Sequence, residues 1–166
     1  MFYDLTRYRR GLAMVLVVLA AGGPVGDGEE PSAEEAAVSR ARAIYAGTWR
    51  LVAVESNGDP QPQDSREILV VNRLDGSWTL TIDGDDVSSG QSRMDPLANP
   101  PEIDLDFTDG EGKGQRLLAI YEVMGRRRML CFRDDKGWRP REFRTQVGDG
   151  AVLLTFEKQE AQPAAP

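Results

Sequence analysis

The chain has 166 residues, with 20 Lys and Arg against 27 Asp and Glu, a formal net charge of −7, one cysteine and no histidine. The missing histidine excludes Ser-His-Asp and Cys-His catalysis in their usual forms and histidine-based zinc sites. One cysteine excludes an internal disulfide, a CxxC redox pair and a thiolate metal cluster. The acidic balance disfavours nucleic acid as a partner, because phosphates repel negative charge. The sequence therefore predicts no catalytic residue, metal or cofactor, and its length suits one compact domain.

Residues 1–22 have the pattern of a secretory signal peptide. Three arginines lie among the first ten residues, and an uncharged apolar run and small residues follow them. Cleavage is expected after Ala20 or Gly22. The apolar part is shorter than the roughly 20 residues that span a bilayer, so a membrane anchor is the less favoured interpretation. We expect export to the periplasm, cell envelope or medium, without stable membrane insertion after cleavage; an adjacent arginine pair leaves the export route open.

A linker and a helix are expected next. Residues 23–31 are rich in glycine and acidic residues, which is typical of a flexible linker. Ser32 and Glu35 then have the spacing of a capping box, and apolar residues follow at helical spacing as far as Tyr45. The sequence therefore predicts an amphipathic helix over residues 32–45, whose apolar stripe would cover one end of the following domain.

After the helix, the hydrophobic period changes from 3.6 to 2. Short apolar or alternating segments are separated by turn sequences such as Asn57-Gly58 and Asp75-Gly76. The expected strands lie near residues 47–54, 68–71, 78–82, 87–94, 103–108, 117–124, 129–132, 142–146 and 152–157. No helical pattern separates them, so we predict an all-β domain over residues 46–158, an antiparallel barrel of eight or nine strands, with a sandwich as the alternative. Residues 159–166 are expected to form a disordered tail.

One set of apolar residues is predicted to point into the barrel. It consists of Trp49, Leu51, Trp78, Leu80, Leu105, Phe107 and Tyr121. A barrel of eight strands either fills its interior with side chains or holds one small ligand. These residues are therefore either a ligand site or the core. The ligand interpretation requires a cavity above about 150 Å³, against the roughly 300–1,000 Å³ of typical ligand pockets.

Two further features stand out in the second half of the chain. Arg126, Arg127 and Arg128 follow Gly125 at an expected hairpin tip. Such a cluster can meet an anionic ligand, a protein partner or an envelope polymer, although a solvated turn is the simpler interpretation. Cys131 lies between apolar neighbours and is predicted to be a buried structural thiol, because no histidine is present to activate it.

Two other segments resemble ligand loops only superficially. Asp104 and Asp106 begin an acidic segment whose sixth and twelfth residues are Asp109 and Gln115, where a calcium loop requires glycine and glutamate, so Asp104 and Asp106 are expected to face solvent. The glycine-rich residues 110–114 lack the Gly-Lys-Ser/Thr ending of a phosphate-binding loop. A hairpin loop is expected there instead.

An ordered series of motifs runs through the predicted barrel. The series is Ala46-Gly-Thr-Trp-Arg-Leu-Val52, Ile103-Asp-Leu-Asp-Phe-Thr108, Leu118-Ala-Ile-Tyr-Glu-Val123, Leu130-Cys-Phe132, Arg139-Pro-Arg-Glu-Phe143 and Leu153-Leu154. Gly47-Thr-Trp49 resembles the Gly-x-Trp signature of lipocalins. The whole series, over residues 44–158, resembles an uncharacterised lipocalin-like domain family that is expanded in exported proteins of planctomycetes.

The resemblance implies a small lipocalin-like barrel, an exported location and no catalytic residues. In lipocalins an arginine late in the barrel packs on the early tryptophan, so the resemblance implies a cation–π contact between Trp49 and either Arg139 or Arg144. Phe143, in the same motif as Arg139, is given a structural role. The expected function is that of a non-enzymatic barrel binding a small apolar or amphipathic ligand. The alternative is a cell-envelope interaction or scaffold module with a packed, ligand-free barrel and an unknown protein partner.

Overall fold

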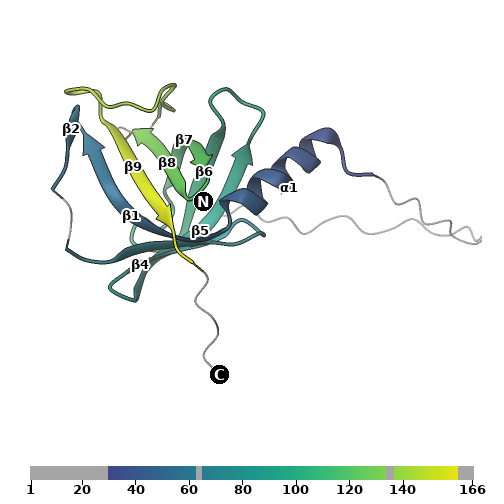
Figure 1. Cartoon of the computed structure of the whole chain (residues 1–166), viewed down its shortest axis with the longest axis horizontal. Coiled ribbons are helices and arrows are strands. Elements are labelled where there is room, and N and C mark those ends of the chain that lie inside the picture. Colours follow the sequence, from purple (N-terminus) through teal and green to yellow (C-terminus); the bar gives the residue numbers. More distant parts are fainter. Residues whose placement is uncertain (1–29, 63–64, 134–136, 161–166) are drawn as a thin grey trace, which may run out of the picture. The chain divides into compact units, whose positions relative to one another are not determined.

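The computed structural model describes residues 30–62, 65–133 and 137–160. The predicted signal peptide and most of the predicted linker and tail lie outside these residues. Helix α1 (Ala33–Tyr45) precedes the strands. The strands are β1 (Gly47–Ser56), β2 (Asp59–Pro60), β3 (Ile68–Asn72), β4 (Ser77–Ile82), β5 (Asp85–Asp95), β6 (Glu102–Gly110), β7 (Arg116–Met124), β8 (Arg127–Arg133) and β9 (Ala151–Lys158) (Figure 1).

The predicted capping box begins α1. The Glu35 amide donates to the Ser32 hydroxyl over 3.2 Å, and the Ser32 amide donates to the Glu35 carboxylate over 2.8 Å. These bonds satisfy amides that the first helical turn leaves without partners. The helix ends at Tyr45, and Gly47, with φ of +122°, lets the chain pass directly into β1. The Arg42 guanidinium donates to the Ser92 carbonyl over 2.9 Å and joins α1 to β5.

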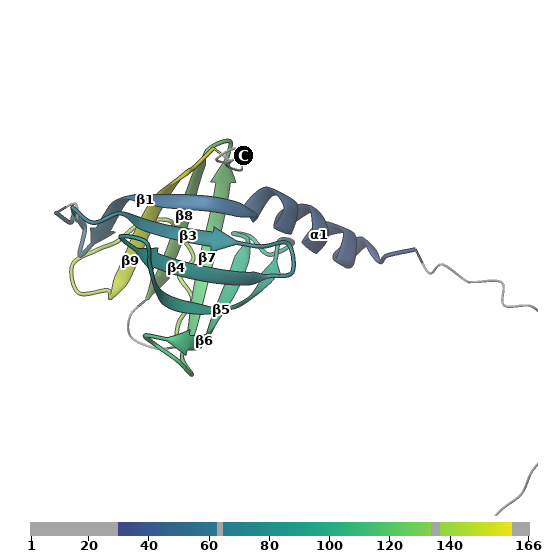
Figure 2. The same cartoon turned by 90° about the horizontal axis from the view of Figure 1, so that it is seen from below.

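The strands form one closed antiparallel barrel. Each strand from β3 to β8 pairs with the next along the chain, β1 pairs with β3, and β9 pairs back with β1 from Trp49↔Lys158 to Ser56↔Val152. The result is a closed barrel of eight strands, with β2 as an extra strand beside the end of β1 (Figures 1 and 2). The predicted lipocalin-like barrel with a short N-terminal helix is confirmed. Closure leaves no long unpaired edge on the barrel.

The prediction of a strand over residues 142–146 is wrong. These residues belong to the connection from β8 to β9, which we call the strap (residues 137–150), and none of the strap is a strand. Both β8 and β9 already have two strand partners, so the closed barrel offers this segment no edge to join. The strap packs on the outside of the barrel instead: the Cys131 sulfur lies 3.9 Å from the Arg144 carbonyl oxygen.

A β-bulge changes the predicted alternation in β1. Leu51 pairs with Phe156 and Ala53 with Thr155, so Val52 is the extra residue. Beyond the bulge the faces exchange, and Ala53 is exposed although the period of two would place it with Trp49 and Leu51.

The barrel is closed more tightly at its α1 end than at the other. The hydrophobic side chains at this end pack into one buried group, which we call the core cluster. It includes Tyr45, Trp49, Ile103 and Phe156. Inward-facing residues farther along the strands, such as Leu80, are only partly buried. The interior therefore has one sealed end and one more accessible end.

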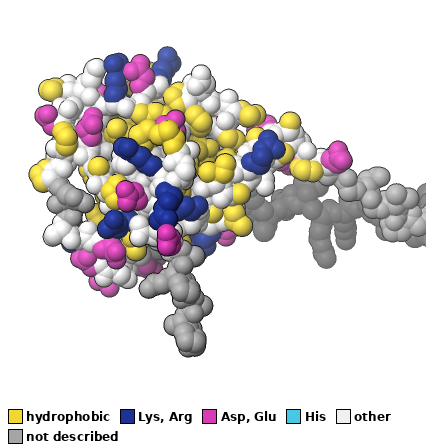
Figure 3. Space-filling model, in the orientation of Figure 1, with side chains coloured by type: hydrophobic (Ala, Val, Ile, Leu, Met, Phe, Trp, Pro, Cys, Tyr) yellow, Lys and Arg dark blue, Asp and Glu magenta, His cyan; other side chains and the backbone are white. Residues whose placement is uncertain are grey.

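Charged side chains of both signs cover the barrel surface between hydrophobic ones, on the face in Figure 3. Asp106 faces outward, where Arg116 and Arg93 approach its carboxylate to 2.5 and 3.0 Å. The Arg116 hydrogen bond is the main cause that lowers the pKa of Asp106. None of the described helical residues form a helix long and apolar enough to cross a membrane.

Candidate functional site

A cavity of about 170 Å³ lies inside the barrel, and we call it the lumen cavity. It is lined by Tyr45, Val70, Asn72, Trp78, Leu80, Leu105, Phe107, Leu117, Arg128, Leu130, Phe132, Leu154 and Phe156. Aliphatic and aromatic side chains dominate this lining. Arg128 is its one charged residue, and no carboxylate is among these side chains.

The residues predicted to point inward fall into two groups. Trp78, Leu80, Leu105 and Phe107 line the lumen cavity. The other three pack in or against the core cluster toward the α1 end: Trp49, Leu51 and Tyr121. The ring of Tyr121 meets that of Tyr45 edge-on, with centroids 5.4 Å apart. Four of the seven predicted residues therefore line the lumen cavity, and the other three belong to the packed core next to it.

Arg128 occupies the place where the resemblance implied another arginine. Its guanidinium carbon lies 4.7 Å from the centroid of Trp49, 4.5 Å from that of Tyr45 and 4.3 Å from that of Phe156. The residue is only 1% exposed. The cation–π contact with Trp49 is thus present, but Arg128 makes it.

Arg139 and Arg144 lie elsewhere, so their predicted packing on Trp49 is wrong. Arg139 donates from Nη1 to the Ile103 and Ala119 carbonyls. Its guanidinium also pairs with Glu102, at 2.8 Å, and with Asp104. These bonds hold the strap on the outer side of β6 and β7, where Asp104 supports the strap rather than facing open solvent. Arg144 pairs with Glu142 within the strap at 2.8 Å, and Phe143 is partly buried there.

The prediction of a single surface cluster at Arg126–Arg128 also needs correction. Arg126 and Arg127 are exposed at the hairpin between β7 and β8, whereas Arg128 is buried. Arg126 pairs with Glu160 at 2.7 Å and donates to the Lys158 carbonyl over 2.9 Å. Because β8 begins at Arg127, strand alternation turns Arg128 inward and leaves its two neighbours outside.

The polar groups of the lumen cavity include donors without acceptors. Neither Nε nor Nη1 of Arg128, nor Nε1 of Trp78, has a hydrogen-bond partner in the described part of the chain. Trp49 differs, because its Nε1 donates to the Tyr45 carbonyl over 2.8 Å. Burial lowers the pKa of Arg128 and raises that of Tyr45. The cavity therefore combines an apolar wall with unsatisfied N–H groups.

A glycine makes room for the tryptophan in the wall. A Cβ on Gly90 would lie 2.6 Å from the Trp78 ring and 1.9 Å from the Asp106 carbonyl oxygen. Trp78 pairs with Gly90 across β4 and β5, and its ring meets Phe107 edge-on with centroids 4.8 Å apart. The missing side chain thus lets the Trp78 ring pack directly against β5.

The cavity residues on β8 and β9 were not predicted from the sequence. The period of two places Arg128, Leu130 and Phe132 on one face of β8, which was the available signal for all three. In β9 the same period pairs Leu154 with Phe156 on the inner face. The inward position of Arg128 was not predicted because Arg128 was grouped with the exposed Arg126 and Arg127.

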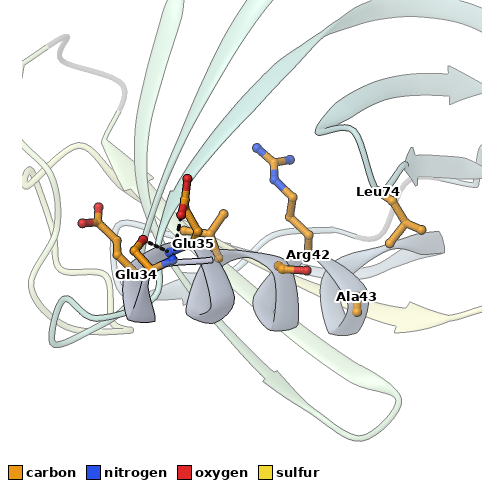
Figure 4. A pocket seen from close by; sticks show the side chains of 8 residues that line it. Glu34, Glu35, Arg42, Ala43 and Leu74 are labelled. Carbon is orange, nitrogen blue, oxygen red and sulfur yellow. Dashed lines mark hydrogen bonds between the residues drawn. The ribbon is translucent and has the colours of Figure 1, made fainter. Parts of the chain in front are cut away.

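Other depressions lie on the surface around α1. The wider one, of about 920 Å³, runs along the helix and includes Glu34, Glu35, Arg42, Ala43 and Leu74 (Figure 4). Glu35 already bonds to Ser32, and Arg42 to the barrel. A second, of about 610 Å³, lies between α1 and the segment joining β5 to β6. The described residues hold no group of three or more His, Cys, Asp or Glu side chains arranged to bind a metal ion.

Comparison with known proteins adds no relative: the chain matches no protein-family model, no curated protein and no solved structure.

Proposed function

We propose that this protein is an exported, non-enzymatic lipocalin-like barrel that binds one small apolar or amphipathic molecule in its lumen cavity. The observation that carries the proposal is the cavity of about 170 Å³ walled by aliphatic and aromatic side chains. An engineered apolar cavity of about 150 Å³ is enough to bind benzene. The volume is below the roughly 300–1,000 Å³ of drug-sized sites, so the expected ligand is small.

The sequence supports the proposed export, and the cavity lining supports the proposed lack of catalysis. The basic and apolar pattern of residues 1–22 is typical of a secretory signal peptide. The resemblance to the planctomycete lipocalin-like family points to the same location. For catalysis, the lining of the lumen cavity offers no acid–base pair and no activated nucleophile.

A direct test is native mass spectrometry of the purified full chain, followed by titration with toluene as an apolar probe. We expect either a co-purified mass or a rise in melting temperature with toluene, because a ligand that binds only the folded state stabilises it. If the chain carries no added mass and toluene leaves its melting temperature unchanged, the proposal fails.

A matched pair of variants locates the binding. Leu80 lines the lumen cavity, whereas Thr81 follows it on the opposite face of β4. Leu80→Trp should fill the cavity and abolish the response to toluene, and Thr81→Trp should add the same ring outside and preserve it. Equal responses in the two variants would place the probe elsewhere.

The alternative, an interaction module of the cell envelope, rests on a different observation. Trp138 is 74% exposed and Val147 is 87% exposed, and both belong to the strap. Exposed apolar side chains mark a protein-binding surface where they form one contiguous patch. A pull-down from envelope extract with the wild-type chain and the Trp138→Ser variant tests this function, which requires a partner captured only by the wild type.

A further inference from the structure

Arg128 brings a positive charge to the inner face of the barrel. It is 1% exposed, and the described residues that line the cavity include no Asp or Glu. Burying an unpaired cation costs several kcal/mol, because it loses its hydration. The sequence places this charge where an apolar residue such as its neighbour Leu130 would pack without that cost.

The aromatic rings around Arg128 offset only part of this cost. The rings of Tyr45, Trp49 and Phe156 attract the positive charge through their π electrons. The Tyr45 hydroxyl oxygen carries no charge, and Nε and Nη1 of Arg128 keep no hydrogen-bond partner among the described residues. What the site lacks is therefore an acceptor with negative charge.

Other donors of the same lining lack a full complement of acceptors. Nε1 of Trp78 is buried without a partner. Among the described residues, the Asn72 amide donates from Nδ2 to the Val70 carbonyl over a long 3.5 Å. Buried donors without acceptors are rare in folded proteins, so several on one cavity indicate a missing acceptor.

We infer that the ligand of the lumen cavity is a small monoanion with an apolar body, a carboxylate whose oxygens accept hydrogen bonds from Arg128 and Trp78. This inference rests on the proposed function and names its ligand class. The carboxylate neutralises Arg128, and charge-assisted hydrogen bonds of this kind are roughly twice as strong as neutral ones. The aliphatic lining, including Leu80 and Leu105, contacts the apolar body.

The size of the cavity sets the probes. A volume of about 170 Å³ suits a body close to benzene in size. Benzoate and benzamide have nearly the same shape and differ in charge, whereas benzylamine carries the opposite charge. Calorimetric titration of the full chain at neutral pH should give benzoate an affinity at least about tenfold above that of benzamide, with no binding of benzylamine.

Variants assign the preference to its donors. Arg128→Met keeps an unbranched apolar chain and should make benzoate and benzamide bind equally. Arg127→Met, the matched control on the exposed neighbour, should keep the preference. Trp78→Phe removes one donor and keeps an aromatic ring, so the preference should fall by about two- to fivefold. Should Arg128→Met fail to fold, the wild-type series and Trp78→Phe still decide the matter.

Each pattern of results has one meaning. Preference for benzoate that Arg128→Met abolishes supports the inference. Equal binding of benzoate and benzamide to the wild type overturns it and leaves the proposed function standing, as does binding of toluene alone. If toluene, benzoate and benzamide all fail to bind, the inference is wrong, and the proposed function is wrong too when the purified chain carries no added mass.

Discussion

Cys131 and Arg128 show how strand position decides the chemistry of a side chain. Both lie on β8, three residues apart, and both are buried. Arg128 faces the lumen cavity, whereas Cys131 lies on the opposite face beneath the strap, next to the Arg144 carbonyl. Opposite faces of one strand thus hold a cation with unsatisfied donors and a thiol that is covered.

The burial of Cys131 predicts low reactivity. Burial is the main cause that raises its pKa to about 11, so almost no thiolate is present at pH 8. A disulfide reagent at that pH should label the folded chain far more slowly, by about a hundredfold or more, than the chain in denaturant. The measurement is the rate of thiol release by absorbance.

The sign of the shift also predicts a pH dependence. Because folding raises the pKa of the Cys131 thiol above its ordinary value of 9.0, the thiol favours the folded state below that pH. This contribution is lost as the pH rises from about 9 toward 11.

Rapid labelling of the native protein at pH 8 would contradict the buried position of this thiol.

At the scale of elements, two contacts between neighbouring segments depend on single residues. Arg139 fixes the strap by bonds to the Ile103 and Ala119 carbonyls and by ion pairs with Glu102 and Asp104. Gly90 lets β5 lie against the Trp78 ring and the Asp106 carbonyl. The first contact covers the outside of the barrel, and the second shapes the wall of the lumen cavity.

Gly90→Ala should therefore destabilise the protein. The added Cβ meets the backbone oxygen of Asp106, which cannot rotate away, so β5 and β6 must separate. Overpacking of this kind typically costs about 1–3 kcal/mol, to be measured by urea denaturation. Gly137→Ala is the matched control: a Cβ there meets nothing within 4 Å, and its effect should stay within about 0.5 kcal/mol. Equal stability of the two variants would show that β5 and β6 can separate without loss of folding free energy.

At the scale of the whole molecule, ion pairs between neighbouring strands make stability depend on acid. Asp106 on β6 pairs with Arg93 on β5 and Arg116 on β7. The hydrogen bond from Arg116 is the main cause that lowers the pKa of Asp106 in the folded state. The stabilisation is therefore complete above the ordinary pKa of aspartate, about 3.9, and is lost as the pH falls through the lower folded value.

Asp106→Asn should flatten this acid dependence. We expect the variant to be less stable than the wild type at pH 7, and the difference to shrink as the pH falls below about 4. Urea denaturation at a series of pH values measures it. Asp109→Asn is the control, because Asp109 is 76% exposed and its pair with Lys113 spans 3.5 Å. If the stability of the wild type and of Asp106→Asn differs by the same amount at every pH, Asp106 does not contribute to the acid dependence of stability.

The sequence was informative about the barrel because strand formation depends on short-range pattern. The change of period after Tyr45 and the turns at Asn57-Gly58 and Asp75-Gly76 predicted most strands within a few residues. It was less informative about the strap, since residues 142–146 have an acceptable strand pattern but no free edge to pair with. The candidate site was predicted in part: four wall residues line the cavity as expected, whereas Arg128 was expected at the surface.

Composition and short-range pattern were enough to exclude histidine chemistry and an internal disulfide and to predict the capped helix and the antiparallel strands, because these depend on residue types and on residues close in the chain. The closure of the strands into a barrel, the arginine that lies over Trp49 and the position of the cavity became clear only from the tertiary structure. Barrel closure brings Tyr45, Trp49, Arg128 and Phe156 together from three strands and the end of α1. Such contacts depend on the register of strands far apart in sequence, which no local pattern records.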